Sequence, residues 1–130
     1  MDGKDLFETY NEKGKLVYPD EVAFASLPWH PHAKFEGVEL KHLITSEQTS
    51  GLFSYHLVRI APNKKIGKHL HEKQLETHEV ISGSGICNSN GKTYSYVPGN
   101  IGVFPMNIEH EIVADEAGMC IFAKFIPALL

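Results

Sequence analysis

Residues 67–85, GKHLHEKQLETHEVISGSG, concentrate side chains that can bind a metal ion or move a proton. Side chains alternate along a β-strand, so His69 and His71 would point to the same face of one strand. A turn through residues 72–75 and a second strand from Glu76 would bring this carboxylate beside both imidazoles. Two histidines and one carboxylate form a ligand set that suits divalent transition metals.

His78 follows Glu76 by two residues, so strand alternation places both side chains on one face, about 7 Å apart. A histidine that faces a metal cavity could act as a general acid or base, and we take His78 as the candidate catalytic residue. A packed histidine without a chemical role is the alternative, and a β-bulge would reverse its direction. Glu72 and Glu79 are expected at the surface.

The chain from Gly37 onward predicts short strands separated by turns. Segments such as 38–44 and 52–60 alternate or are rich in β-branched and aromatic residues, and Asn90-Gly91 is a strong hairpin signal. No segment shows a sustained period of 3.6 residues. Many short strands at regular spacing predict an all-β barrel or jelly-roll sandwich over residues 37–130. Proline breaks predict an N-terminal arm with one or two short strands over residues 1–36.

The His-rich stretch resembles the first of two motifs of the cupin family. In that motif an HxH pair is followed at fixed spacing by a glutamate and then by a glycine. Here His69 and His71 are followed after four residues by Glu76, and six further residues lead to a glycine, Gly83. The glycine that opens the motif is replaced by Asn63, and asparagine is one of the few residues that tolerate left-handed backbone geometry.

Residues 99–110 resemble the second cupin motif. Gly99 is followed after five residues by Pro105, and His110 comes after four more. The glycine two residues after the proline is replaced by Asn107, which again preserves the backbone requirement. Several fixed spacings therefore hold together over residues 63–113, and the chain resembles small single-domain cupins with an RmlC-like jelly roll.

The resemblance implies a fold, a metal site and a class of function. The fold would be an all-β cupin double-stranded β-helix, and the metal ligands would be His69, His71, Glu76 and His110. The cofactor would be a divalent transition metal (Zn, Fe, Mn, Ni or Cu), held so that it can polarise a carbonyl or acidify a water. The function would be that of an isomerase, lyase or dioxygenase acting on a small oxygen-rich or carboxylated metabolite. The alternatives are a metal-loaded protein that binds or senses a small molecule without turnover, and a structural barrel without metal.

Three further residues are candidates for a substrate pocket. An inward Arg59 would suit a carboxylate substrate, and Tyr55 shares its strand face. His56 has the opposite parity on this strand, so at most one of His56 and Arg59 can face the cavity. Met106 lies close to His110 in sequence and is expected at the mouth of the barrel.

Composition limits the partners. The formal net charge is −4 with no basic block, which argues against nucleic acid as a partner. No apolar run is long enough to span a bilayer, and the charged N-terminus has no signal-peptide pattern. Cys87 and Cys120 lack metal-type spacing, so we expect free thiols and a cytoplasmic protein. Phe24, Leu27 and Trp29 could give the arm an apolar patch, and we expect a homodimer with a small-molecule ligand.

Overall fold

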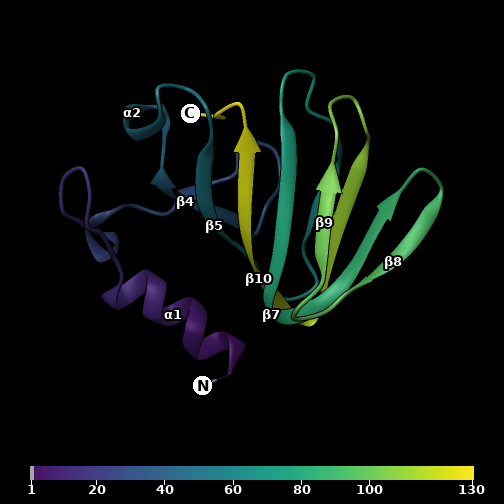
Figure 1. Ribbon diagram of the computed structural model, residues 1–130. Helices are drawn as coiled ribbons and strands as arrows, with labels where there is room; N and C mark the ends of the chain where they lie inside the picture. The colour runs from purple at the N-terminus through teal and green to yellow at the C-terminus, as the bar shows by residue number, and fades with distance from the viewer. Residues whose placement is uncertain (1) are drawn as a thin grey trace.

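The computed structural model describes residues 2–130, and most of its regular structure is antiparallel β-sheet (Figure 1). The strands are β1 (Lys15–Leu16), β2 (Val22–Ala23), β3 (His30–Pro31), β4 (Val38–Ile44), β5 (Ser54–Ile60), β6 (Lys65–His69), β7 (Leu75–Ser89), β8 (Lys92–Tyr96), β9 (Ile101–Phe104) and β10 (His110–Ile126). The helices are α1 (Gly3–Lys13), α2 (Ser46–Thr49) and the single 3₁₀ turn η1 (Phe24–Ser26). The predicted jelly-roll architecture is confirmed.

Two long strands, β7 and β10, each belong to two walls of the barrel. Residues 75–83 of β7 pair with residues 119–126 of β10, and residues 85–89 of β7 pair with residues 110–114 of β10. The first pairing is flanked by β9 on one side and by β5, β4 and β3 on the other, and we call this wall the first sheet. The second pairing is flanked by β8 and β6, and we call it the second sheet.

The two long strands bend where they pass from one sheet to the other. Gly83 in β7 and Gly118 in β10 both have φ of +73°, which glycine adopts without the steric penalty of a side chain. A Cβ atom at Gly83 would lie 2.0 Å from the carbonyl oxygen of Gly118, so the two backbones approach too closely for any other residue. The glycine that closes the first sequence motif is therefore needed for the closure of the barrel.

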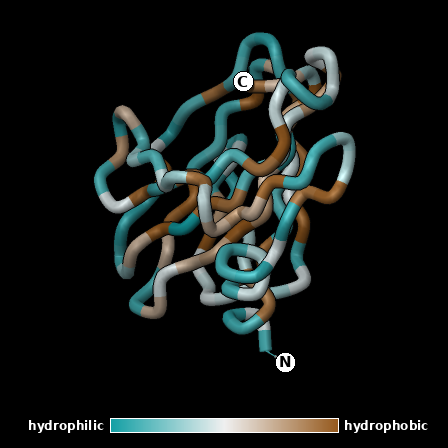
Figure 2. The backbone as a smooth tube through the Cα atoms, turned by 90° about the vertical axis from the view of Figure 1, so that its left-hand side faces the viewer, coloured by the Kyte–Doolittle hydropathy of each residue, from teal (hydrophilic) through white to brown (hydrophobic). Residues whose placement is uncertain are grey.

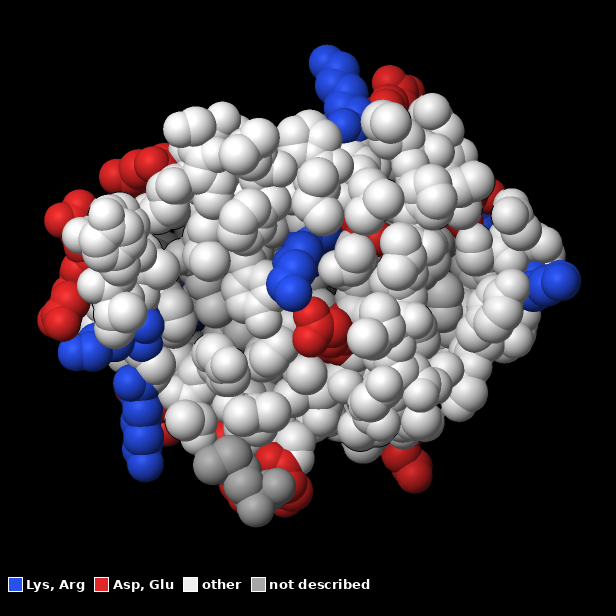
Figure 3. Space-filling model, in the orientation of Figure 1, with Lys and Arg blue, Asp and Glu red and all other residues white. Residues whose placement is uncertain are grey.

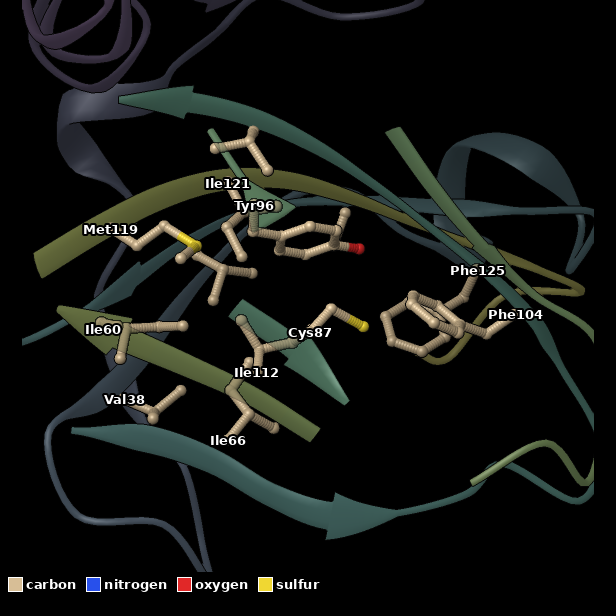
Figure 4. Packing of buried hydrophobic residues seen from close by; sticks show 14 residues of the cluster. Val38, Ile60, Ile66, Cys87, Tyr96, Phe104, Ile112, Met119, Ile121 and Phe125 are labelled. Atoms are coloured by element: carbon tan, nitrogen blue, oxygen red, sulfur yellow. The ribbon is translucent and has the colours of Figure 1, made fainter. Parts of the chain in front are cut away.

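The hydrophobic core lies between the two sheets. Figure 2 shows the hydrophobic residues gathered along the strands and the hydrophilic ones along many of the loops. Figure 4 shows labelled core side chains from several strands directed into one common interior. The cluster consists of Val38, Val58, Ile60, Ile66, Val80, Cys87, Tyr96, Phe104, Ile112, Ala114, Met119, Ile121, Ala123 and Phe125. This packing makes the sheets a rigid support for polar side chains that project from the inner faces of the strands.

The N-terminal arm contains a helix that the sequence did not predict. α1 begins after Asp2, whose side chain accepts a hydrogen bond of 2.9 Å from the backbone N–H of Asp5. Phe7 is 1% exposed, and its ring lies 6.2 Å from that of Phe122 on the outer face of the first sheet. The arm therefore contains a helix in addition to the short strands that were expected, because capping and one buried aromatic residue hold α1 against the barrel.

The apolar side chains of the arm pack against the chain's own barrel. Phe24 is buried, and Leu27 and Trp29 pack against the same cluster as Phe7. These residues do not form the free apolar patch that the sequence suggested as a dimer interface. The homodimer itself stays a prediction.

Charged side chains are scattered over the face shown in Figure 3, where most of the surface is uncharged. Several of the basic side chains are paired with acidic ones, as in the contact of 3.1 Å between Lys124 Nζ and Glu79 Oε1. Among the helices within residues 2–130, none has the length and apolar character required to cross a membrane.

Candidate metal centre

Three strands and the turn between two of them bring together four side chains that could bind a metal. His69 ends β6 and His110 begins β10, and the two residues are directly opposite each other in the register of these strands. Glu76 is the second residue of β7, and His71 lies in the turn that joins β6 to β7. The four donor atoms of His69, His71, Glu76 and His110 all lie within 4.8 Å of one another. Ligand bonds of about 2.0–2.2 Å around one ion produce separations of this size.

Backbone hydrogen bonds fix the tautomers of two of these imidazoles. His69 Nδ1 lies 2.7 Å from the carbonyl oxygen of Gly67, and His110 Nδ1 lies 3.0 Å from that of Ile108. A carbonyl only accepts hydrogen bonds, so each Nδ1 carries a proton and donates it. The Nε2 atom of each neutral ring is then left with a lone pair. This arrangement is typical of histidines that bind a metal through Nε2.

The centre holds more acceptor atoms than donors. His110 Nε2 lies 2.9 Å from Glu76 Oε1, so a proton or a metal ion must lie between two atoms that both carry lone pairs. His71 Nε2 lies 3.3 Å from the same oxygen, yet it is buried and has no hydrogen-bond partner among residues 2–130. The distance between His71 Nε2 and Glu76 Oε1 is short enough for a hydrogen bond, but the two groups are not aligned for one. A divalent cation would satisfy all of these lone pairs at once, so the four residues fit a metal ion.

Burial sets the charge of the donors. Burial lowers the pKa of His69 to about 4, so its imidazole is neutral and able to bind a metal near pH 7. Burial alone would raise the pKa of Glu76, but the neighbouring His78, which also donates a hydrogen bond to Oε2, holds this pKa well below its usual value. The lone pair of His69 Nε2 and the carboxylate of Glu76 are therefore available to a metal ion near pH 7.

A left-handed turn joins the loops that present His71 and His110. Asn107 has φ of +66°, and its backbone N–H donates a hydrogen bond of 2.8 Å to the carbonyl oxygen of His71. Asn63, before β6, has φ of +62°, and its N–H bonds the carbonyl oxygen of Asp115 at 2.9 Å. Both asparagines thus adopt the geometry expected of the glycines that they replace.

The comparisons with known proteins agree with this architecture. The family model for the cupin domain matches residues 56–124, more than half of the chain. This chain is a cupin. A search of curated proteins finds no match.

Solved structures with the same fold include enzymes of different kinds. This cupin is similar to a predicted oxalate decarboxylase from Thermotoga maritima (21% identity, TM-score 0.69, covering 79% of this chain and 95% of that one). It is also similar to the polyketide cyclase RemF from Streptomyces resistomycificus (20% identity, TM-score 0.71, covering 82% of this chain and 77% of that one). A third similar structure is the oxalate decarboxylase of Bacillus subtilis, described for its Mn(II) centres (19% identity, TM-score 0.68, covering 82% of this chain and 29% of that one). At these identities the likeness shows the shared fold.

Three of the four donor residues, His69, His71 and Glu76, line an interior cavity of about 70 Å³. Its walls are otherwise mainly aliphatic and aromatic, and the remaining lining residues are His32, Val38, Leu40, Val58, Ile66, His78, Ile121, Ala123, Phe125 and Leu129. A larger cavity of about 670 Å³ opens between β8 and β9. None of the four donor residues lines this larger space, so the candidate metal site adjoins the smaller cavity.

His32 is a cavity residue that the sequence did not assign to the site. The arm carries it to the cavity through β3, and its Nδ1 accepts a hydrogen bond of 3.0 Å from the backbone N–H of Lys34. Its Nε2 therefore carries the proton and is a donor in the neutral ring, and burial lowers the pKa of this imidazole. The only signal in the sequence was a second HxH pair, His30 and His32, which the intervening proline made unlike a strand.

The three candidates for a substrate pocket lie outside this cavity. Arg59 projects to the outer face of the first sheet, where its Nε donates to Glu39 Oε1 at 2.9 Å and its guanidinium lies 3.9 Å from the centre of the Trp29 ring. Tyr55 shares that outer face and packs near Phe122. The assignment of Arg59 and Tyr55 to the pocket is therefore corrected: strand alternation turns His56, not Arg59, inward. Met106 is 54% exposed and is not among the cavity residues.

Proposed function

We propose that this cupin is a metal-dependent enzyme that acts on a small oxygen-rich or carboxylated metabolite, as an isomerase, lyase or dioxygenase. The observation that supports the proposal is a set of three imidazoles and one carboxylate in which His71 Nε2 is buried without a hydrogen-bond partner among the described residues, and three of the four residues line an interior cavity. Solvated surface histidines would not produce such a surplus of buried acceptors, because burial of unpaired polar atoms is unfavourable.

The cavity favours a small anionic group at the metal. Its volume of about 70 Å³ corresponds to roughly two water molecules in the liquid, so a carboxylate or a hydroxy-carbonyl group could enter by displacing water. Three neutral imidazoles and one carboxylate leave a divalent ion with a net charge of +1. Glu76 is the only acidic residue that lines the cavity within the described chain, so little opposes the entry of an anion.

In the proposed reaction, different residues would hold the metal, exclude water and orient the substrate. His69, His71, Glu76 and His110 would hold the metal, which when bound would polarise a carbonyl or acidify a water. The aliphatic walls exclude bulk water and strengthen the electrostatic interactions inside the cavity. The Nε2–H of His32 supplies a hydrogen-bond donor on the wall, suited to orienting an oxygen of the substrate.

The identity of the metal is proposed as Zn, Fe, Mn, Ni or Cu. All of these accept nitrogen and carboxylate ligands, and their selection depends on geometry and availability. Manganese is the first ion to test, because the structurally similar oxalate decarboxylase of Bacillus subtilis is described for its Mn(II) centres.

The first test measures metal binding. The purified protein is stripped, reloaded with each ion, and analysed for metal content and thermal stability. An ion at 100 times its dissociation constant should stabilise the fold by about 2.7 kcal/mol, which raises Tm by on the order of 10 °C. His69→Ala should abolish this shift, whereas His30→Ala at an exposed position should retain it. Less than stoichiometric metal with every ion would overturn the proposal.

The second test measures turnover. Each loaded form is assayed against a panel of keto acids, sugar acids and catechols, and products are identified by mass spectrometry. Formation of a product that the His69→Ala variant does not form would support the enzyme. Stoichiometric binding of a panel compound without product would instead favour the metal-loaded binding protein.

A further inference from the structure

Behind the metal centre, His78 uses both ring nitrogens to connect Glu76 to Tyr96. His78 is 2% exposed, its Nε2 lies 2.9 Å from Glu76 Oε2, and its Nδ1 lies 3.1 Å from the hydroxyl of Tyr96. An ionised carboxylate only accepts hydrogen bonds, so Nε2 must carry a proton and donate it. In the neutral ring Nδ1 then accepts from the Tyr96 hydroxyl. One chain of donors therefore runs from Tyr96 through His78 to Glu76.

The two oxygens of Glu76 have different partners. Oε1 faces His71 and His110 at 3.3 Å and 2.9 Å, whereas Oε2 is occupied by the N–H of His78. A carboxylate on a flexible side chain could turn to offer a metal either oxygen or both. The bond from His78 restricts that rotation and leaves Oε1 as the oxygen on the side of the imidazoles.

Tyr96 is itself held in place by its surroundings. It is 3% exposed, and Figure 4 shows its hydroxyl directed through the core toward the end that holds Phe104 and Phe125. A Cβ atom at Gly102 would lie 2.0 Å from this hydroxyl oxygen, so the absence of a side chain in β9 makes room for it. Gly102 lies opposite His78 in the register of β7 and β9. The absence of a side chain at Gly102 therefore leaves room for the Tyr96 hydroxyl beside His78.

We propose that His78 and Tyr96 are positioning residues that hold Glu76 with Oε1 toward the metal and Oε2 away from it. This inference rests on the proposed metal site and replaces the expectation that His78 exchanges a proton with a substrate. Both ring nitrogens of His78 are already engaged, so it acts through Glu76. Residues that hold a metal ligand in this way typically change metal affinity by about 10- to 100-fold when they are substituted.

The test compares metal affinity and the EPR spectrum of Mn(II) in matched variants. His78→Phe keeps an aromatic ring but removes the donor, and should weaken Mn(II) binding by about 10- to 100-fold in competition with a chelator. His78→Gln retains an N–H donor and should recover part of the affinity. Tyr96→Phe should weaken binding by a smaller factor, whereas Tyr94→Phe, half-exposed on the same strand, should not change it.

A second pair of readouts separates positioning from a loss of folding. Gly102→Ala should displace the Tyr96 hydroxyl, which its Cβ would approach more closely than it approaches the Phe104 ring, and should weaken Mn(II) binding and alter the EPR spectrum in the same direction as Tyr96→Phe. Folding is checked by circular dichroism of each stripped protein, and if His78→Phe does not fold, the Tyr96 and Gly102 variants decide. Unchanged affinity and spectrum in folded variants would overturn the positioning role. Failure of the unaltered protein to bind metal would instead overturn the proposed function.

Discussion

Phe7 is the one buried side chain of α1, so we predict a large effect of Phe7→Ala on stability. Phe7 is 1% exposed and lies 6.2 Å from both Trp29 and Phe122, measured between ring centres. A buried aromatic side chain removes about 150–250 Å² from water, which at about 25 cal/mol per Å² is an upper estimate of ~4–6 kcal/mol. Substitutions of buried Phe by Ala destabilise proteins by about 3–5 kcal/mol. We expect the free energy of unfolding to fall by about 3–4 kcal/mol.

Urea unfolding followed by two probes measures this effect. Trp29 is the single tryptophan, and its contact with Phe7 makes its fluorescence a reporter of the arm, while circular dichroism reports the barrel. If α1 detaches first, fluorescence will change at lower urea than circular dichroism, and the barrel will unfold with a smaller m-value. The control is Leu6→Ala, 38% exposed on the same helix, which should change stability by less than about 1 kcal/mol. A loss below about 1 kcal/mol for Phe7→Ala, with coincident transitions, would refute the reasoning.

Three other predictions concern the barrel. Gly83→Ala should lower the free energy of unfolding by more than about 2 kcal/mol, because its Cβ would lie 2.0 Å from the Gly118 carbonyl oxygen. Gly91→Ala, with the same φ of +73° but open space, should lower it by about 1 kcal/mol, and equal losses in urea titrations would contradict this view. Burial lowers the pKa of His56 to about 4, so the unfolded chain binds more protons and stability should fall as pH decreases from about 6.5 to 4. His56→Gln should flatten this part of the pH profile of Tm, and an unchanged profile would show that His56 does not cause it. Light scattering at micromolar concentration should give the mass of a homodimer, and a monomer would disprove that expectation.

The metal centre could be predicted because its geometry depends on short-range rules. Alternation places His69 on the inner face of β6 and Glu76 on that of β7, and the turn between them is too short to separate the two strands widely. The distant member of the donor set, His110, was implied by the spacing of the second motif, which ends at His110 and contains the turn at Asn107. The positive φ of Asn107 shows that the motif encodes backbone geometry as well as ligand identity. The binding of a metal by these four residues remains the subject of the proposed experiments.

The N-terminal helix could not be predicted from periodicity, because α1 is short and mostly polar. Within Gly3–Lys13 only Phe7 is buried, and Leu6 and Tyr10 remain more than one-third exposed. One buried residue in three turns gives no repeating pattern. The available signal was the capping residue, Asp2, which alone is also compatible with a turn. The helix is stabilised mainly by contacts with the barrel, which a local pattern does not contain.

The same arm explains why the substrate-pocket residues were misassigned. Alternation along β5 established that His56 and Arg59 point in opposite directions, but not which of the two directions leads inward. Leu57 is 0% exposed and Val58 is 4% exposed, although they point to opposite faces, because the core covers one face and the arm covers the other. A strand buried on both faces has no polar side to mark the solvent. His32 was missed for a related reason, since its place in the cavity depends on how the arm crosses the sheet. The arm covers the outer face of β5, so this strand has no polar face that would show its orientation, and the arm also supplies His32 to the cavity. The roles of residues that contact the arm therefore require the three-dimensional structure.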